Sequence, residues 1–200
     1  MKFKITPRLF FSKVFILILF AIMAVTSNIY KEGGVANLVF EIMGYSLLFM
    51  SALGRMWASA YIAGKKGKEF VATGPYSITR NPLYFFSFLG YIGVGMAFES
   101  LSLTVGMAAL FFFTHWNTIL SEEKGNHQRF GSVYEAYAGQ VPRFIPDPRQ
   151  FKDIEESNFY PKSFFRAFIG SSLIVLVFPL AHLIEWGHIH SIIPVLFLIP

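Results

Sequence analysis

Arg80 lies in a block of sequence whose residue types suit the binding of an anionic ligand. The block runs from Gly74 to Tyr84 and reads Gly-Pro-Tyr-Ser-Ile-Thr-Arg-Asn-Pro-Leu-Tyr. Gly-Pro is typical of a turn, and Pro82 suits the first turn of a helix, so we expect Arg80 at a helix entrance. A planar guanidinium there fits a carboxylate or a phosphate. The alternative is an arginine that only extends toward the membrane surface.

Two adjacent carboxylates, Glu122 and Glu123, follow an apolar segment. Neighbouring side chains on a helix project about 100° apart, so at most one of the two can face a given pocket. A carboxylate at this place can bind ribose hydroxyls, hold a cationic ligand or accept a proton. The alternative is a solvated pair that balances Lys124 and Arg129.

Aromatic residues follow the acidic pair. Phe130, Tyr134 and Tyr137 are spaced four and three apart, which places them on one face of a short helix. A helix lying on a membrane surface has the same pattern. The prolines of residues 141–146 predict an extended strap on the membrane surface, in which Arg143 can meet an anionic head group or substrate.

Histidines give weaker signals. His115 shares a helix face with Thr118 and Glu122, which allows a proton relay. A polar contact between helices is the favoured interpretation. His188 and His190 are two residues apart without a cluster of carboxylates, so we interpret them as structural, and we expect no metal site.

Composition determines the kind of molecule that must position these residues. Hydrophobic residues make up 54% of the 200-residue chain and charged residues 14%, with 24 phenylalanines. Soluble domains are about 45–50% apolar and about 25% charged. These values exclude a disordered chain and an ordinary soluble fold, and the absence of cysteine excludes a thiol nucleophile or a cysteine-bound metal. We expect one integral membrane domain over residues 1–200.

Hydropathy predicts an all-α, polytopic membrane bundle with about five spans. A span needs about 20 apolar residues. The candidates are 9–29, 35–63, 83–98, 101–120 and 164–184. Only Glu99 and Ser100 separate the third from the fourth, which predicts a helical hairpin. The stretch 192–199 is too short to span, and we leave open whether it is re-entrant, interfacial or truncated.

Charge orients this bundle. Nearly all of the 17 lysines and arginines lie before residue 14 or within residues 64–82 and 121–166. Cationic loops stay in the cytoplasm, which predicts a cytoplasmic N-terminus in a multi-pass protein of a bacterial inner membrane. The net charge of +5 fits an anionic lipid leaflet, and we expect no nucleic acid partner. The chemistry then belongs on the cytoplasmic face, between the two long segments.

Four sequence elements occur here in an informative order. GPYSITRNPLY is followed by EE, then FGSVYEAY, then VPRFIP. Together they resemble the isoprenylcysteine carboxyl methyltransferase and phospholipid methyltransferase family, whose members are multi-span membrane enzymes that use S-adenosylmethionine. The resemblance covers about residues 51–146, the motif-bearing catalytic region. It departs from the family at Asn81, where the family has His, and at Asn126, where it usually has Leu.

The resemblance implies particular roles. It assigns cofactor binding to Gly74, Tyr76, Arg80, Asn81, Pro82, Tyr84, Glu122 and Glu123. Glu123 and Arg143 are the candidate catalytic residues, with Arg143 expected at the polar end of the acceptor. Arg80 suits the carboxylate of S-adenosylmethionine, and Glu122 or Glu123 suits its ribose or amine.

The sequence thus predicts methyl transfer from S-adenosylmethionine to a lipidic or amphiphilic acceptor, as in isoprenylcysteine carboxyl methyltransferases. The expected partners are membrane lipids and this acceptor. Three alternatives remain open: a phospholipid N-methyltransferase, a membrane reductase that resembles sterol reductases and uses NADPH, and a small transporter without enzymatic activity.

Overall fold

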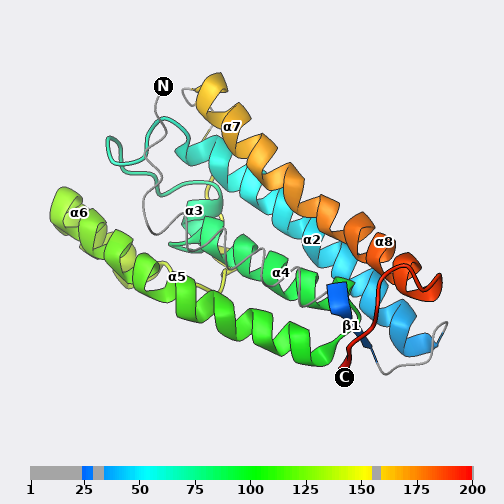
Figure 1. Cartoon of the computed structure of the whole chain (residues 1–200). Helices are drawn as coiled ribbons and strands as arrows, with labels where there is room; N and C mark the ends of the chain where they lie inside the picture. The colour runs from blue at the N-terminus through cyan, green and yellow to red at the C-terminus, as the bar shows by residue number, and fades with distance from the viewer. Residues whose placement is uncertain (1–23, 29–33, 155–158, 200) are drawn as a thin grey trace, which may run out of the picture.

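The chain forms a bundle of long helices that lie side by side (Figure 1). The computed structural model describes residues 24–28, 34–154 and 159–199. In chain order the elements are β1 (Thr26–Asn28), α2 (Val35–Ile62), α3 (Pro75–Ile78), α4 (Pro82–Ala97), α5 (Leu101–Phe130), α6 (Ser132–Gln140), the 3-10 helix η1 (Pro148–Gln150), α7 (Pro161–Ser172), the 3-10 helix η2 (Leu173–Leu176), α8 (Val177–Ile189) and β2 (Phe197–Ile199). The predicted all-α membrane bundle is confirmed, with one short strand pair added.

Three helical segments are long and apolar enough to cross a membrane, namely Val35–Ile62, Leu101–Phe130 and Pro161–Ile189. α4 is also apolar but has only 16 residues, fewer than the about 20 that a perpendicular span needs. Four of the five predicted spans therefore coincide with helices. Most of the predicted span 9–29 lies outside the described residues.

Glycines allow α2 and α4 to pack closely. A Cβ atom at Gly93 would lie 3.0 Å from the backbone nitrogen of Leu48, and one at Gly44 would lie 2.8 Å from that of Ala97. Larger residues would hold the two backbones apart, and membrane helices commonly associate through such small residues. The glycines of residues 90–95 thus serve helix packing.

Glu99 and Ser100 form the turn of the predicted hairpin between α4 and α5. Glu99 has a φ of 51° and is only 5% exposed. Its carboxylate accepts a hydrogen bond of 2.7 Å from Nδ2 of Asn37 on α2. The Ser100 hydroxyl accepts from the backbone N–H of Leu103 at 3.2 Å and caps α5. This end of the hairpin is therefore tied to α2 by a buried polar contact.

The last helical segment is two α-helices joined by η2, where the sequence predicts one span. Pro179 lies in the first turn of α8 and has no N–H to donate to the carbonyl of Val175. Residues 173–176 adopt the tighter 3-10 form at this point. The apolar stretch Pro161–Ile189 is nevertheless continuous enough to cross a membrane.

The residues of β1 are extended, so the prediction of a membrane helix that reaches residue 29 is wrong at its end. β1 pairs in parallel with β2, with Thr26 opposite Phe197. The backbone N–H of Leu196 also donates to the carbonyl of Val25 at 2.8 Å. The stretch 192–199 thus ends as a strand. Its partner comes from the other end of the chain, which no local pattern reveals.

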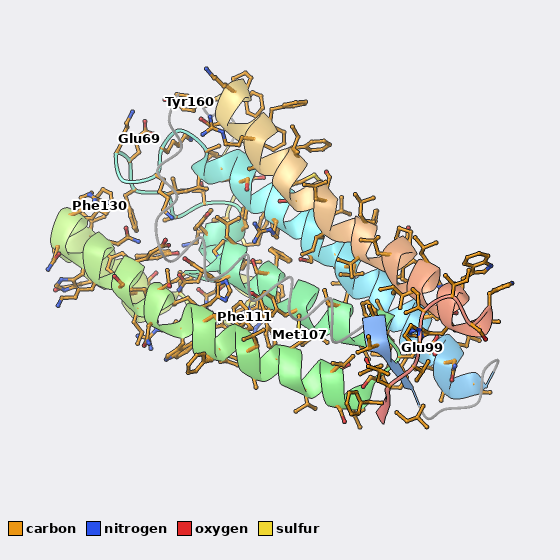
Figure 2. All side chains as sticks on the ribbon, in the orientation of Figure 1. Glu69, Glu99, Met107, Phe111, Phe130 and Tyr160 are labelled. Carbon is orange, nitrogen blue, oxygen red and sulfur yellow. The ribbon has the colours of Figure 1, made fainter. Side chains whose placement is uncertain are left out.

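Two packed regions hold the bundle together. Leu48 of α2, Ala97 of α4 and Ala181 of α8 form a buried apolar cluster. A second region is aromatic, and the side chain of Phe111 on α5 is fully buried in it (Figure 2). Large apolar side chains also cover the outside, with Phe113 85% exposed. Apolar patches of this kind suit contact with lipid.

Candidate functional site

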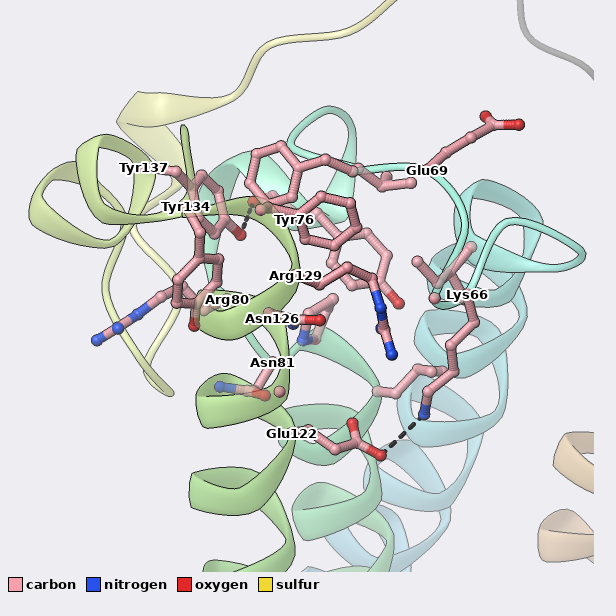
Figure 3. Close-up of a pocket in the computed structure, with 18 of the residues that line it drawn as sticks. Lys66, Glu69, Tyr76, Arg80, Asn81, Glu122, Asn126, Arg129, Tyr134 and Tyr137 are labelled. Atoms are coloured by element: carbon pink, nitrogen blue, oxygen red, sulfur yellow. Dashed lines mark hydrogen bonds and ion pairs between the residues drawn. The ribbon is translucent and has the colours of Figure 1, made fainter. Parts of the chain in front are cut away.

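A cavity of about 250 Å³ lies where residues 62–84 meet α6 and the second half of α5 (Figure 3). Pockets for small molecules usually measure about 300–1,000 Å³, so this one is close to the lower end. The lining combines aromatic, charged and amide side chains, including Lys66, Glu69, Phe70, Tyr76, Arg80, Asn81, Pro82, Tyr84, Glu122, Asn126, Arg129, Phe130, Tyr134 and Tyr137. Six of the predicted cofactor-binding residues are among them: Tyr76, Arg80, Asn81, Pro82, Tyr84 and Glu122.

Gly74 is a predicted site residue that lies outside the cavity lining. It has a φ of +57° and precedes α3, whose four residues are all buried. A Cβ atom there would lie 2.3 Å from the ring of Tyr61. The Ser77 hydroxyl donates to the Gly74 carbonyl at 2.7 Å and closes the turn. Gly74 therefore shapes the turn that leads to Arg80, and only glycine adopts this conformation without strain.

The predicted extended strap of residues 141–146 runs against the turn that carries Arg80. The Arg80 backbone N–H donates to the carbonyl of Pro142 at 2.9 Å, and that of Asp147 donates to the carbonyl of Ile78 at 2.9 Å. The hydroxyl of Thr79, which is fully buried, donates to the Phe144 carbonyl at 3.1 Å. The two blocks that the sequence singles out are thus joined through their backbones.

Glu123 is the centre of the polar contacts behind the cavity. Its Oε2 accepts from Nη1 of Arg80 at 3.3 Å and from Nε of Arg143 at 3.1 Å. Its Oε1 accepts from Nδ2 of Asn81 at 2.8 Å. Asn81 also donates to the backbone carbonyl of Arg143 at 3.0 Å. Glu123 is 8% exposed, so this carboxylate is held by three donors in a largely dry environment.

Glu122 faces the other way, as expected of neighbouring positions on a helix. It lines the cavity, and its Oε1 forms an ion pair of 2.8 Å with Nζ of Lys66 across the opening. The Lys66 side chain is 67% exposed and that of Glu122 is 36% exposed. Solvent weakens such a pair, which leaves Glu122 able to exchange partners.

The predicted catalytic residues, Glu123 and Arg143, do not line this cavity. Both lie beside a shallow groove on its far side, together with Lys124 and His127. Glu123 reaches the cavity only through Arg80 and Asn81, which it holds. Their geometry is that of positioning residues.

Two buried polar atoms of residues that line the cavity have no hydrogen bond of standard geometry in the described part of the chain. They are Nε of Arg80 and the hydroxyl of Tyr134. Tyr134 is 4% exposed, and burial raises the pKa of its hydroxyl. The nearby charge of Glu123 raises this pKa further, whereas Arg80 lowers it through its charge and through its close approach to the hydroxyl. Both atoms are inaccessible to solvent, so they lie in the packed layer behind the cavity surface.

An aromatic wall closes one side of the cavity. The ring of Phe70 lies 5.3 Å from that of Phe130, 6.2 Å from Tyr134 and 5.1 Å from Tyr137. The Tyr137 hydroxyl donates to the Tyr76 carbonyl at 2.7 Å. Burial raises the pKa of both Tyr76 and Tyr137, so both stay neutral at physiological pH. The sequence predicts Phe130, Tyr134 and Tyr137 on one face of a single short helix. In the structure α5 ends at Phe130 and the two tyrosines belong to α6, yet all three rings contact Phe70.

The histidines take part in packing contacts. The ring of His115 stacks on Phe111 at 4.8 Å and touches Tyr84 edge-on at 5.9 Å, which fits the contact between helices that we favour over a relay. His188 contacts the Ala24 carbonyl at 2.7 Å, and His190 that of Trp186 at 2.9 Å. Within the described ranges no three His, Asp or Glu side chains group as metal ligands.

Sequence reasoning missed several cavity residues. Asn126 and Arg129 lie one and two turns after Glu122, so they share its helix face, and that spacing was a usable signal. Lys66 and Phe70 come from an irregular loop without periodicity, so only the length of the loop pointed to them.

Apolar helices long enough to cross a membrane, with a polar and aromatic cavity at one end of the bundle, are the features of a helical membrane protein with a candidate ligand pocket. The family model for phospholipid methyltransferase matches residues 33–132. The chain belongs to this phospholipid methyltransferase family, which confirms the predicted resemblance. No solved structure matches the chain.

Two curated relatives are similar over most of the chain. The nickel-cobalt-cadmium resistance protein NccN of Alcaligenes xylosoxydans xylosoxydans is 33% identical over 143 residues, covering 68% of this chain and 67% of its own length. The cobalt-zinc-cadmium resistance protein CzcN of Cupriavidus metallidurans is 32% identical over 151 residues, covering 72% of this chain and 68% of its own. The chain is thus a membrane protein of a methyltransferase family with relatives named for metal resistance.

Proposed function

We propose that this protein transfers a methyl group from S-adenosylmethionine to a lipidic or amphiphilic acceptor at the cytoplasmic face of the membrane. The observation that carries the proposal is the cavity whose lining combines the aromatic rings of Phe70 and Phe130, the Glu122 carboxylate and the Arg129 guanidinium. Membership of the phospholipid methyltransferase family supports the reaction class.

The cavity lining fits the chemical groups of this cofactor. S-adenosylmethionine supplies a methyl group already activated by a positively charged sulfur. The Phe70 and Phe130 rings suit its adenine, and the Glu122 carboxylate suits its ribose hydroxyls or its amine. Asn126 and Arg129 also line the cavity and offer further polar contacts.

The residues of the chain contribute mainly by positioning. Methyl transfer to an oriented acceptor needs alignment more than covalent help from the protein. Glu123 holds Arg80 and Asn81, and the strap fixes the backbone of the same turn. Asn81 can donate and accept hydrogen bonds but cannot take up a proton. This favours an acceptor that arrives as a carboxylate over an amine that must first lose a proton.

The acceptor enters from the bilayer in this proposal. Pro82, Leu83 and Tyr84 line the cavity and also form the first turn of α4, which continues into the apolar bundle. An acceptor with a lipid tail can then lie along the helices while its polar end reaches the cavity.

The test is calorimetry of the purified protein in detergent micelles with S-adenosylhomocysteine. We expect binding by the wild type and roughly 2- to 10-fold weaker binding by Tyr134→Phe, which keeps the ring but removes the hydroxyl beside Arg80. Tyr45→Phe, on α2 against Phe178, is the matched control. Saturable binding of NADPH instead of S-adenosylhomocysteine would favour the reductase alternative and overturn the proposal.

The names of the two relatives suggest a cellular setting. We infer that methylation of a membrane acceptor contributes to tolerance of divalent metal ions. Expression of wild type and of Tyr134→Phe in a metal-sensitive bacterium tests this inference. We expect growth on cobalt, zinc or cadmium to improve with the wild type and less so with the variant. Equal growth of the two strains would show that metal tolerance does not depend on the cavity.

A further inference from the structure

Arg129 is a second arginine of the cavity, distinct from the one that the sequence motif contains. It lies in the last turn of α5 and lines the cavity. Figure 3 shows its guanidinium directed into the space between Asn126 and Lys66. Among the residues that the structure describes, this guanidinium has no hydrogen bond and no ion pair.

The other cations of the cavity lining already have carboxylate partners. Lys66 and Glu122 pair with each other at 2.8 Å, and Nη1 of Arg80 is bound to Glu123. Glu69 lies at the rim with its carboxylate turned away from the cavity (Figure 3). Among the described residues, Arg129 is therefore the cation of the cavity lining without an ion pair, and an anionic group is the ligand that suits it.

The surroundings of Arg129 direct its guanidinium. Gly67 has a φ of +78°, and a Cβ atom there would lie 3.2 Å from Nη1 of Arg129. The loop backbone thus lies directly against the guanidinium. Asn126 lies one turn earlier on the same face of α5, where the family pattern usually has Leu, and its amide also lines the cavity. An amide and a guanidinium side by side can both donate to one carboxylate.

We infer that Arg129, assisted by Asn126, binds the carboxylate of the amino acid part of S-adenosylmethionine. The inference rests on the proposed function and assigns this carboxylate to a different residue from Arg80, which the sequence had suggested. The guanidinium fork matches a carboxylate with two parallel hydrogen bonds, whereas Arg80 is already committed to Glu123.

The experiment compares two ligands that differ in the carboxylate. S-adenosylhomocysteine carries the amino acid part, and 5′-deoxy-5′-methylthioadenosine lacks it. By calorimetry we expect Arg129→Gln to weaken the first ligand roughly 10- to 100-fold and to leave the second unchanged. Arg129→Lys keeps the charge but loses the fork, so its loss is expected to be smaller.

Lys124→Gln is the matched control. It removes one positive charge from the same stretch of α5, at a residue that borders the groove on the far side of the cavity. We expect wild-type affinity for both ligands. Asn126→Leu is the second variant if Arg129→Gln does not fold, and it is expected to weaken S-adenosylhomocysteine alone.

The outcomes separate this inference from the proposed function. Equal losses for both ligands, or no loss for either, in a folded Arg129→Gln protein would overturn the role of Arg129 while leaving the methyltransferase proposal intact. A wild-type protein that binds neither ligand would overturn both. If Arg129→Gln binds S-adenosylhomocysteine as the wild type does but has a higher KM for the acceptor, Arg129 binds a carboxylate of the acceptor. That result would overturn the assignment to the donor.

Discussion

Replacement of Glu123 by alanine is the perturbation whose cost the structure defines best. The change removes one carboxylate and leaves three donors without their acceptor. The Arg80 side chain is 14% exposed and Asn81 is 7% exposed, so water cannot fully replace the lost contacts. The Arg143 side chain is 42% exposed and is readily solvated.

The magnitude follows from these exposures. Removing one partner of a buried ion pair costs about 3–5 kcal/mol. Because one of the donors is half exposed, we place Glu123→Ala at the lower end, about 3 kcal/mol. For a chain of this size that corresponds to a fall of about 6–12 °C in the unfolding midpoint. Glu122→Ala breaks an exposed pair and should cost less than about 1 kcal/mol.

The assay is thermal unfolding in detergent, followed by the fluorescence of the three tryptophans. Glu122→Ala differs from Glu123→Ala by one position on the same helix, so the two variants share composition and net charge. Equal shifts in the two midpoints, or a shift under 1 °C for Glu123→Ala, would refute the reasoning that Glu123 organises the site.

Two further predictions concern packing and pH. Gly93→Ala forces a Cβ against the Leu48 backbone and should destabilise the bundle by about 1–3 kcal/mol, whereas Gly106→Ala, with open space around it, should be neutral or slightly stabilising in the same unfolding assay. Burial raises the pKa of Tyr137 above its ordinary value of 10.0, so the unfolded chain loses this proton first as the pH rises. The contribution of Tyr137 is therefore complete below about pH 10 and declines above it. Tyr137→Phe should lower the midpoint at neutral pH, through the lost hydrogen bond to Tyr76, but flatten its decline above about pH 10; parallel curves would contradict this.

Hydropathy and charge predict most of the fold because both act through local composition. The hairpin at Glu99 and Ser100 is a break between two apolar runs, and the structure has its turn there. The predicted span ends at residue 120, and the helix continues beyond it through Glu122 and Glu123 to Phe130. Hydropathy marks where lipid-compatible residues end, but a helix continues wherever its backbone hydrogen bonds can be made.

The residues of the site could be predicted from the sequence better than their arrangement in space. Motif spacing identified Arg80, Asn81 and Glu122, and helix periodicity required Glu122 and Glu123 to diverge. Which of the two faces the cavity depends on contacts with Lys66 and Arg143, from loops far along the chain. Such contacts leave no trace in a single sequence. The same holds for β1, whose strand exists only because β2 pairs with it.

The hydrogen bonds between the strap and the turn at Arg80 define the smallest piece of this protein worth isolating. The family model ends at residue 132, but the backbone partners of Ile78, Arg80 and Ser77 extend to Asp147 and Lys152. A truncation at the border of the family match would therefore keep the GPYSITRNPLY and EE motifs but remove the strap and most of α6, which support the ligand pocket. Chimaeric proteins made from this chain and a relative should therefore exchange residues 62–153 as a single segment.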